Sequence, residues 1–277
     1  MVYRNWGQLG HRVSHYKGTI DLWREGNSQS HNPSEFQPAR DACETISNVD
    51  EKLLFKKCDI SRLEEIVVLK TQLEDKRGDL VGVINNAGIT TYGPFFKTPT
   101  ASINRLLQIN FVGTLLFTRE LFPLCLLPTP SKNALRYLVF TSSTSAIVPF
   151  PFVGGYPGTK AGVEMSLRAL EFELPKYVKI LFIRPGPVKT ALYGSAMTAP
   201  GADVKHIIEF SNKGTSFSKP TQIARPLLHA IIRKKSGAIY PDLKTKIMFN
   251  AMKMPVIGKA MIRWVSRELS KTFKSES

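Results

Sequence analysis

The sequence predicts an α/β protein built on a doubly wound parallel sheet. Short apolar runs, such as residues 80–84 and 178–183, are typical of parallel strands that are buried on both faces. Segments with a helical period, such as residues 63–73, separate these runs. Polar residues, glycine or proline follow the strands. Because strands alternate with helices, we expect one parallel sheet that is covered by helices on both faces.

The expected elements follow in order from Ala39. Helices are predicted at residues 39–49, 63–73, 103–127, 156–174 and 221–232, the last of which Thr221 caps. Strands are predicted at residues 53–55, 80–84, 135–140, 178–183 and 238–240. Residues 191–218 are expected to form a loop-rich excursion. Ligands of such sheets bind outside the carboxyl ends of the strands, which is where the polar loops of this sequence fall.

The composition is that of a soluble globular protein. The chain has 277 residues, of which 43% are hydrophobic and 22% are charged, enough to bury the core of one α/β domain. Its three cysteines, Cys43, Cys58 and Cys125, match no disulfide framework and no zinc spacing, so we expect no metal site and a reducing compartment. We expect no membrane span and no signal peptide, because no apolar run is long enough and the N-terminus lacks an apolar core.

The positive charge is large and unevenly distributed. The formal net charge is +16, and residues 211–277 hold fourteen Lys and Arg against three Asp and Glu. Such an excess indicates an anionic partner: a membrane surface, a nucleic acid or a phosphorylated ligand. The alternative is a basic, solvated surface with no dedicated partner. No helix-turn-helix, zinc-finger or aromatic-basic strand motif is found, so we expect no nucleic-acid partner.

Tyr156 and Lys160 form the most informative pair of polar residues. If residue 156 begins a helix, positions i and i+4 lie on one face about one turn apart. An ammonium group held beside a phenol favours the phenolate and would lower the tyrosine pKa from its ordinary value of about 10. Tyr156 could then act as a general acid and base near neutral pH. By itself the pair could also be a chance arrangement on a solvated helix face.

Three further groups of residues, at fixed places before and after the Tyr156–Lys160 pair, make a catalytic role for that pair more specific. Residues 85–88, Asn-Asn-Ala-Gly, directly follow a predicted strand; Ser143 stands thirteen positions before Tyr156; and Pro185-Gly186 follows the next strand. With these residues, the chain from Ala39 to Tyr240 resembles the short-chain dehydrogenase/reductases. Within that family it is most similar to the members that act on retinoids, steroids and related lipophilic alcohols or carbonyls. The resemblance implies a Rossmann-like sheet and an NAD(P)-dependent oxidoreductase, and it allows a homodimer.

The resemblance also implies catalytic roles for four residues. Tyr156 would donate a proton to the carbonyl oxygen while the cofactor supplies the hydride. Lys160 would lower the Tyr156 pKa and hold the nicotinamide ribose. Ser143 would hydrogen-bond the carbonyl. Asn110 would support a proton-relay water through a local break in its helix. Each residue also has a purely structural interpretation, namely a strand-end serine, a satisfied buried asparagine or a solvated lysine.

The cofactor-binding residues implied by the resemblance fall in three loops. Asp59 and Ile60 would bracket the adenine ring, and Asn86, Ala87 and Gly88 would lie beside the adenine ribose. The loop after residue 183 would cover the nicotinamide carboxamide with Pro185, Gly186, Val188 and Thr190. Arg40 would follow the second strand and face a 2′-phosphate, which slightly favours NADP over NAD.

The first strand–helix unit of the family fold is missing or replaced in this sequence. That unit should contain a strand, a glycine-rich turn and a helix whose N-terminus holds the cofactor pyrophosphate. Gly7, Gly10 and Gly18 follow no buried strand, and residues 1–38 show no sustained period, so we expect an irregular segment there. Two explanations stay open: an incorrect or alternatively spliced N-terminus of an intact enzyme, or a degenerate member without a firm cofactor site. Losing a central strand would also leave an unpaired edge and a void.

The sequence therefore divides into an atypical segment (1–38), a dehydrogenase domain (39–242) and a basic amphipathic tail (243–277). In the tail, Ile257, Met261, Trp264, Val265 and Leu269 share one helical face, and Lys259, Arg263 and Arg267 share the other. Residues 256–277 could thus lie peripherally on a membrane, or the apolar stripe could pack on the domain or on a partner subunit. The expected localisation is intracellular, either cytoplasmic or peripheral to the endoplasmic reticulum membrane. Aromatic residues that could line an apolar substrate pocket are Tyr92, Phe95, Phe96, Phe150 and Phe152.

Overall fold

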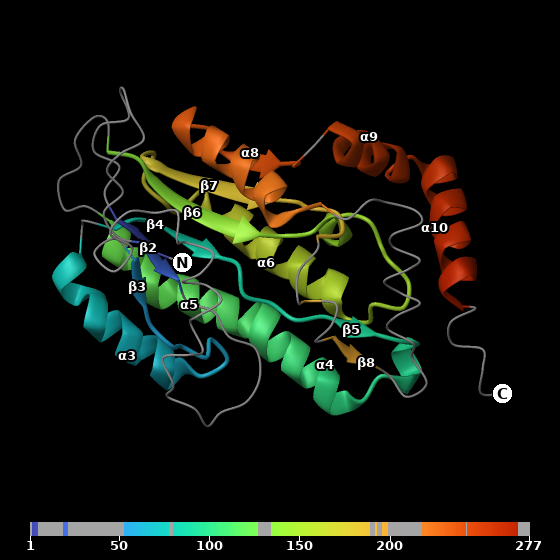
Figure 1. The fold of residues 1–277 in the computed structure, drawn as a ribbon, viewed down its shortest axis with the longest axis horizontal. Helices are drawn as coiled ribbons and strands as arrows, with labels where there is room; N and C mark the ends of the chain where they lie inside the picture. The colour runs from blue at the N-terminus through green and yellow to red at the C-terminus, as the bar shows by residue number, and fades with distance from the viewer. Residues whose placement is uncertain are drawn as a thin grey trace.

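The chain forms a sheet layered between helices (Figure 1). The computed structural model describes residues 2–4, 19–21, 53–77, 80–126, 134–188, 192, 196–198, 218–241 and 243–270. The main sheet has seven strands in the order β3 (Leu53–Phe55), β2 (Thr19–Asp21), β1 (Val2–Arg4), β4 (Leu80–Asn85), β6 (Arg136–Thr141), β7 (Val178–Ile183) and β9 (Gly237–Ile239). The predicted doubly wound α/β architecture is confirmed.

One central strand runs against the others. β1 pairs antiparallel with both β2 and β4, whereas β2–β3, β4–β6, β6–β7 and β7–β9 are parallel pairs. The register places Val2 opposite Val83 and Arg4 opposite Leu80, the first residue of β4. The chain therefore leaves β1 at the amino edge of the parallel strands.

The prediction of an irregular segment at residues 1–38 was wrong for β1 and β2. Each of these strands has three residues, which is too short to show the alternation of polar and apolar residues that marks a strand. They form because neighbouring strands offer backbone hydrogen bonds, which is a tertiary effect. An unpaired strand edge was expected where the first strand of the family fold is missing, but β1 pairs there with both β2 and β4. The predicted helix at 39–49 lies outside the described residues.

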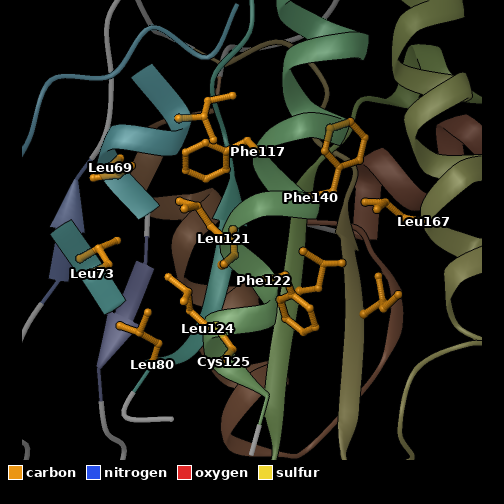
Figure 2. Close-up of a cluster of buried hydrophobic side chains, with 14 of the residues drawn as sticks. Leu69, Leu73, Leu80, Phe117, Leu121, Phe122, Leu124, Cys125, Phe140 and Leu167 are labelled. Carbon is orange, nitrogen blue, oxygen red and sulfur yellow. The ribbon is translucent and has the colours of Figure 1, made fainter. Parts of the chain in front are cut away.

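The larger core lies between the sheet and helices α3 (Leu63–Leu73), α5 (Thr114–Leu121) and α6 (Tyr156–Leu170). Figure 2 shows its side chains, among them Leu69 and Leu73 of α3, Phe117 and Leu121 of α5, and Leu167 of α6. The opposite face of the sheet packs against α8 (Pro220–Ile232) through Ala230 and Ile231. Along β6, Leu138 and Phe140 enter the first core while Tyr137 and Val139 enter the second, as the period of a strand requires.

The single helix predicted at residues 103–127 is interrupted. The structure has α4 (Thr100–Leu107), a π-helical turn at Gln108–Gly113, α5, and a 3-10 turn at Phe122–Cys125. Gly113 ends the π turn where another backbone approaches closely, because a Cβ there would lie 2.4 Å from the Ile60 carbonyl oxygen. Single π turns inside α-helices often occur at functional sites, and this one carries Asn110.

Two further parts stand at the carboxyl end of the sheet. β5 (Thr91–Tyr92) pairs in parallel with β8 (Met197–Thr198), within the predicted loop-rich excursion. The tail folds into two helices, α9 (Leu243–Met252) and α10 (Pro255–Ser270). Met261 and Ile262 of α10 pack with Phe249 of α9 and with Val148. Part of the apolar stripe of the tail thus packs on the domain, which was one alternative to contact with a membrane. The division of the chain into residues 1–38, 39–242 and 243–277 stays a prediction.

No helix within the described residues combines the length and the apolar character that crossing a bilayer requires. The same part of the chain contains no group of three or more His, Cys, Asp or Glu side chains that could bind a metal ion.

Candidate active site

The parallel strands bring most of the predicted residues to one edge of the sheet. β4, β6 and β7 end at Asn85, Thr141 and Ile183, so residues 86–88, 142–143 and 185–186 leave the sheet side by side. Helix α6 begins at Tyr156 and runs along this sheet (Figure 1). Sequence positions that are up to a hundred residues apart thus meet at the carboxyl edge.

Asn110 holds the loop that follows β4. Its side chain is fully buried, and its Oδ1 accepts a hydrogen bond from the Ile89 amide at 2.8 Å. Its Nδ2 donates to the Ile89 carbonyl at 2.8 Å and to Thr159 Oγ1 at 3.3 Å. The local break in the helix that was expected at Asn110 is present as the π turn. The observed bonds fix the Gly88–Ile89 backbone and connect it to α6.

Ser143 points its hydroxyl group toward Tyr156. The Ser143 Oγ accepts hydrogen bonds from the Ser145 amide at 3.1 Å and from Ser145 Oγ at 2.9 Å. Because Ser143 Oγ accepts both of these bonds, its own hydroxyl proton is available for donation. Ser143 also forms a hydrogen bond with Tyr156, which acts to lower the Tyr156 pKa. The two hydroxyl groups thus lie close enough to interact, and a carbonyl oxygen bound between them could accept hydrogen bonds from both.

The expected lowering of the Tyr156 pKa does not occur in this arrangement. Burial raises the pKa of Tyr156 to about 12, and the hydrogen bond from Ser143 offsets only part of that effect. The Lys160 ammonium lies 5.8 Å from the centre of the Tyr156 ring, which is not a hydrogen bond to the hydroxyl group. At neutral pH Tyr156 is therefore a protonated phenol, able to donate a proton.

Lys160 is buried with few polar partners. Its Nζ donates to the Thr141 carbonyl at 2.9 Å and lies 4.9 Å from the centre of the Phe140 ring. Only 3% of the residue is exposed, and desolvation lowers the pKa of Lys160 to about 8. An ammonium group has three N–H donors. Among the described residues Lys160 shows one hydrogen-bond acceptor, so it can still bind hydroxyl groups of a ligand.

The buried Lys160 predicts a specific dependence of stability on pH. Its pKa is about 10.5 in the unfolded chain and about 8 in the folded protein, so between these values the unfolded state binds more protons. The free energy of unfolding therefore rises with pH from about 8 to about 10.5, by about 3 kcal/mol from this residue. The Lys160→Met variant should lose this rise, which urea unfolding of both proteins across that pH range measures. Parallel curves for the two proteins would show that Lys160 titrates normally.

The residues expected beside the adenine ribose occupy the end of β4. Asn86 is exposed, and its Oδ1 accepts a hydrogen bond from Thr141 Oγ1 at 2.9 Å, which connects the ends of β4 and β6. Ala87 follows it, half-buried. Gly88 packs directly on the site, because a Cβ there would lie 3.2 Å from Asn110 Oδ1 and 3.3 Å from Lys160 Nζ.

Asp59 and Ile60 follow β3. Asp59 is exposed, and its Oδ1 accepts hydrogen bonds from the Ser61 amide at 2.9 Å and from Ser61 Oγ at 2.7 Å. Ile60 packs against the larger core, and its carbonyl meets Gly113 of the π turn. The loop after β3 is thereby fixed against the helix that carries Asn110.

The loop after β7 is anchored at both of its described ends. The Pro185 carbonyl accepts a hydrogen bond from the Thr144 amide at 3.1 Å. Gly186 and Val188 are half-buried, and Val188 forms a bridge with Ser218. Thr190 lies outside the described residues, as does Arg40. The roles assigned to all of these residues stay predictions.

The aromatic residues that were proposed to line a pocket do not share one environment. Phe96 is 99% exposed and Phe95 is 54% exposed, so neither lines a closed pocket. Tyr92 is buried in β5, and Phe150 packs on Phe249 with ring centres 6.4 Å apart. Phe152 has a positive φ of 63°, a strained backbone conformation that its carbonyl stabilises by accepting a hydrogen bond from the Gly93 amide.

Comparison with known proteins decides the family. The model of the short chain dehydrogenase family matches residues 21–200, well over half of the chain. The chain belongs to the short-chain dehydrogenase family. Among curated relatives, it is 26% identical over 238 residues to the NADPH-dependent 3-dehydrocapnine reductase of Ornithobacterium rhinotracheale, covering 82% of this chain and 83% of that protein. It is 26% identical over 215 residues to estradiol 17-beta-dehydrogenase 2 of Rattus norvegicus, covering 74% of this chain but 54% of that protein.

Solved structures show the same fold. A short-chain dehydrogenase from Streptomyces avermitilis has a TM-score of 0.67 at 18% identity, covering 92% of this chain and 90% of that one. A short-chain dehydrogenase from Burkholderia phymatum, solved in complex with NAD, has a TM-score of 0.65 at 16% identity, covering 79% and 82%.

The site of this short-chain dehydrogenase fits one half of a dinucleotide better than the other. Lys160 is buried and shows one hydrogen-bond acceptor among the described residues, so its remaining donors suit the hydroxyl groups of a nicotinamide ribose. Among the described residues, β1 places no turn beside the diphosphate half, because it ends at Arg4 on the edge opposite to Asn86 and Ser143. A phosphate-binding turn directly after β1 would begin on the wrong side of the sheet.

Several residues that shape the site were not selected from the sequence. Thr159 connects Asn110 to α6, Ser145 orients Ser143, and Thr141 contacts both Lys160 and Asn86. Small hydroxyl residues next to the catalytic positions are common in any sequence, so they give no usable signal. Glu164 and Arg184 form a buried ion pair, which only their spatial contact reveals.

Proposed function

We propose that this chain is an NAD(P)-dependent oxidoreductase that interconverts a lipophilic alcohol and its carbonyl. The observation that carries the proposal is the pairing of the Ser143 and Tyr156 hydroxyl groups at the carboxyl edge, with the buried Lys160 one turn along α6. The family membership supports the reaction class. The substrates named for two relatives, 3-dehydrocapnine and estradiol, support a lipophilic substrate.

In the proposed mechanism the chain's own residues bind and protonate the substrate. Ser143 donates a hydrogen bond to the carbonyl oxygen, and Tyr156 gives its proton to that oxygen as negative charge develops. Lys160 would hold the nicotinamide ribose, and Asn110 fixes the loop that carries Gly88. Bound nicotinamide dinucleotide would supply or accept the hydride. Asp59, Ile60, Asn86, Ala87, Pro185, Gly186, Val188 and Thr190 would hold the rest of the cofactor.

The test of this function is carbonyl-dependent oxidation of NADPH and NADH by the purified chain. Retinal, steroid ketones and small polar ketones are offered as substrates. The proposal expects turnover with the lipophilic carbonyls, and the rate with each dinucleotide decides between NADP, which Arg40 favours, and NAD. Turnover that is confined to small polar ketones would contradict the lipophilic substrate.

We also propose that α9 and α10 contact an anionic membrane surface, which would give the protein a peripheral membrane localisation. Large apolar side chains are exposed on and between these helices: Leu243, Ile247, Met254, Val256, Ile257 and Trp264. The basic side chains Lys259, Arg263 and Arg267 are exposed on α10. Exposed apolar residues among basic ones are the features by which a helix lies on anionic lipid. Both helices stand at the end of the sheet where the site lies (Figure 1).

The corresponding prediction concerns three exposed charges. The triple variant Lys259→Gln, Arg263→Gln, Arg267→Gln should bind phosphatidylserine vesicles about a hundredfold more weakly, because each basic residue near such a surface contributes about 1 kcal/mol. Vesicle sedimentation measures the binding. This variant is sharper than deletion of residues 256–277, because Met261 and Ile262 belong to a buried cluster.

A matched triple variant is the control for that experiment. Arg233, Lys234 and Lys235 are exposed at the turn before β9, the amino end of that strand. Changing these three residues to Gln removes the same charge from the opposite end of the molecule and should leave vesicle binding unchanged. Equal losses in both triple variants would indicate attraction by net charge alone and would contradict a membrane-binding surface on α10.

A second function is favoured by the direction of β1. In the described part of the chain β1 delivers no turn to the edge of the candidate site, which favours a non-catalytic family member that acts as a membrane-associated or scaffolding protein. Calorimetric titration with NADPH and NADH distinguishes the two functions. A folded chain that binds neither dinucleotide but does bind anionic vesicles would support the non-catalytic function.

A further inference from the structure

A buried carboxylate stands on the same face of α6 as the catalytic pair. Glu164 follows Lys160 by one helical turn, as Lys160 follows Tyr156. Only 4% of Glu164 is exposed. A carboxylate at this depth is costly unless it is paired and hydrogen-bonded, and nothing in the mechanism above uses it.

Both oxygens of Glu164 are fully occupied by donors from three elements. Oε2 accepts from Ser142 Oγ at 2.8 Å and from Arg184 Nε at 3.2 Å. Oε1 accepts from Arg168 Nη2 at 3.0 Å and forms a close ion pair with Arg184 Nη2. Desolvation acts to raise the pKa of Glu164, but the Arg184 hydrogen bond and charge outweigh it and hold that pKa below its usual range.

The two main partners of Glu164 lie where β6 and β7 end. Ser142 follows β6 and immediately precedes Ser143, and its amide donates to the Ile183 carbonyl at 2.9 Å. Arg184 follows β7 and immediately precedes Pro185. The Arg184 Nη1 also donates to the Tyr240 hydroxyl at 3.1 Å, just beyond β9. One carboxylate therefore connects α6 to two strand ends, and through Arg184 to a third.

Ser143 is enclosed by these contacts. On one side Ser142 is held by Glu164, and on the other side the Thr144 amide donates to the Pro185 carbonyl at 3.1 Å. Tyr156, which receives the Ser143 hydrogen bond, begins the helix that carries Glu164. Any shift of the strand ends relative to α6 would therefore change the distance between the two hydroxyl groups.

We propose that Glu164 is a positioning residue, whose contacts with Ser142 and Arg184 hold the Ser143 and Pro185 loops in register with α6 and so set the geometry between Ser143 and Tyr156. This inference rests on the oxidoreductase function proposed above. This role differs from a purely structural one. If Glu164 positions the site, a variant that lacks its contacts should have a misplaced Ser143 even when its thermal stability equals that of the wild type.

The experiment separates positioning from stability with a single and a double variant. Glu164→Gln leaves the buried Arg184 without a carboxylate and should lower both Tm and kcat. The double variant Glu164→Leu, Arg184→Met removes both buried charges; apolar replacement of a buried ion pair is often neutral or stabilising, so it should recover Tm. If Glu164 positions the site, kcat of the double variant should stay about 10- to 100-fold below wild type while KM changes little, because small misplacement of reacting groups costs rate.

A second readout needs no substrate and no cofactor. Hydrogen exchange at the Thr144 and Ser145 amides reports the bonds to Pro185 and Ser143. Exchange should be faster in the double variant than in wild type despite equal Tm. The control is the double variant Lys70→Met, Glu120→Leu, which removes a partly buried ion pair between α3 and α5, with Nζ and Oε2 3.0 Å apart. In this control, kcat and hydrogen exchange at residues 144–145 should not change.

Each outcome decides the proposal. Recovery of kcat and of amide protection together with Tm in the double variant would show that Glu164 only stabilises the fold, and would overturn the inference. Wild-type exchange and kcat in Glu164→Gln would overturn it as well. If the wild-type chain turns over no carbonyl, the proposed function fails, and the exchange comparison still supports or contradicts positioning by Glu164.

Discussion

Replacing Tyr156 by Phe is expected to reduce turnover to background while leaving the affinity for the dinucleotide nearly unchanged. The variant keeps the ring and removes only the hydroxyl group that hydrogen-bonds Ser143. Proton transfer by a positioned side chain contributes a factor of about 10²–10⁴ to rate, so a loss of this size in kcat is expected. Steady-state kinetics and calorimetric titration with NADPH measure the two quantities.

The matched control is Tyr137→Phe. The Tyr137 hydroxyl donates to the Ile231 carbonyl at 3.0 Å, in the core on the α8 side of the sheet. Its loss should lower the free energy of unfolding by about 1 kcal/mol, with no effect on kcat. Retained turnover in Tyr156→Phe would remove Tyr156 from the proton-donor role, and equal losses in the two variants would indicate a general effect of losing a buried hydroxyl group.

Replacing residues 1–38 by an intact strand, glycine-rich turn and helix is expected to strengthen dinucleotide binding by about a hundredfold or more. In the native chain β1 runs antiparallel to β4 and ends at the amino edge. A parallel first strand would instead deliver its turn to the edge where Asn86 and Ser143 lie. Backbone amides and the helix N-terminus would then bind the pyrophosphate, and each hydrogen bond to a charged group contributes about 1.5–3 kcal/mol.

The measurement is calorimetric titration of the native chain and the chimera with NADPH, NADH and nicotinamide mononucleotide. The gain should appear for the dinucleotides but not for the mononucleotide, because the proposed site for the nicotinamide half is Lys160 and the Pro185 loop. A second chimera with the turn glycines changed to valine is the control and should lose the gain. Tight dinucleotide binding by the native chain, unchanged in the chimera, would show that residues 1–38 already build a diphosphate site.

Much of the fold follows from local pattern alone. The runs that became β3, β7 and α3 are bounded as expected, because each is a predominantly apolar strand or an amphipathic helix with clear polar ends. The candidate site could also be predicted, since residues that follow parallel strands must meet at one edge of the sheet. The spacing of Tyr156 and Lys160 needed only the geometry of a helix.

Features that depend on contacts between distant residues could not be predicted. The pairing of Glu164 with Arg184 joins residues twenty positions apart. The helix break at Asn110 was expected from the family resemblance alone, because its π turn forms where the helix packs against the distant Ile60 backbone. The direction of the Tyr156 pKa shift was predicted wrongly, because burial, which a sequence does not display, outweighs a lysine that points at Thr141 instead.

From the sequence we could predict β3, β4, β6, β7 and β9 with α3, α6 and α8 in their order along the chain, and the family resemblance. The four catalytic residues implied by that resemblance stay predictions. The predicted elements and the resemblance depend on local periodicity and on spacing along the chain. Three features are visible only in the folded protein: the reversed β1 at the centre of the sheet, the packing of one face of α10 on the domain, and the burial of Lys160. Strand direction, packing and desolvation are set by partners far away in the chain, which a local pattern does not encode.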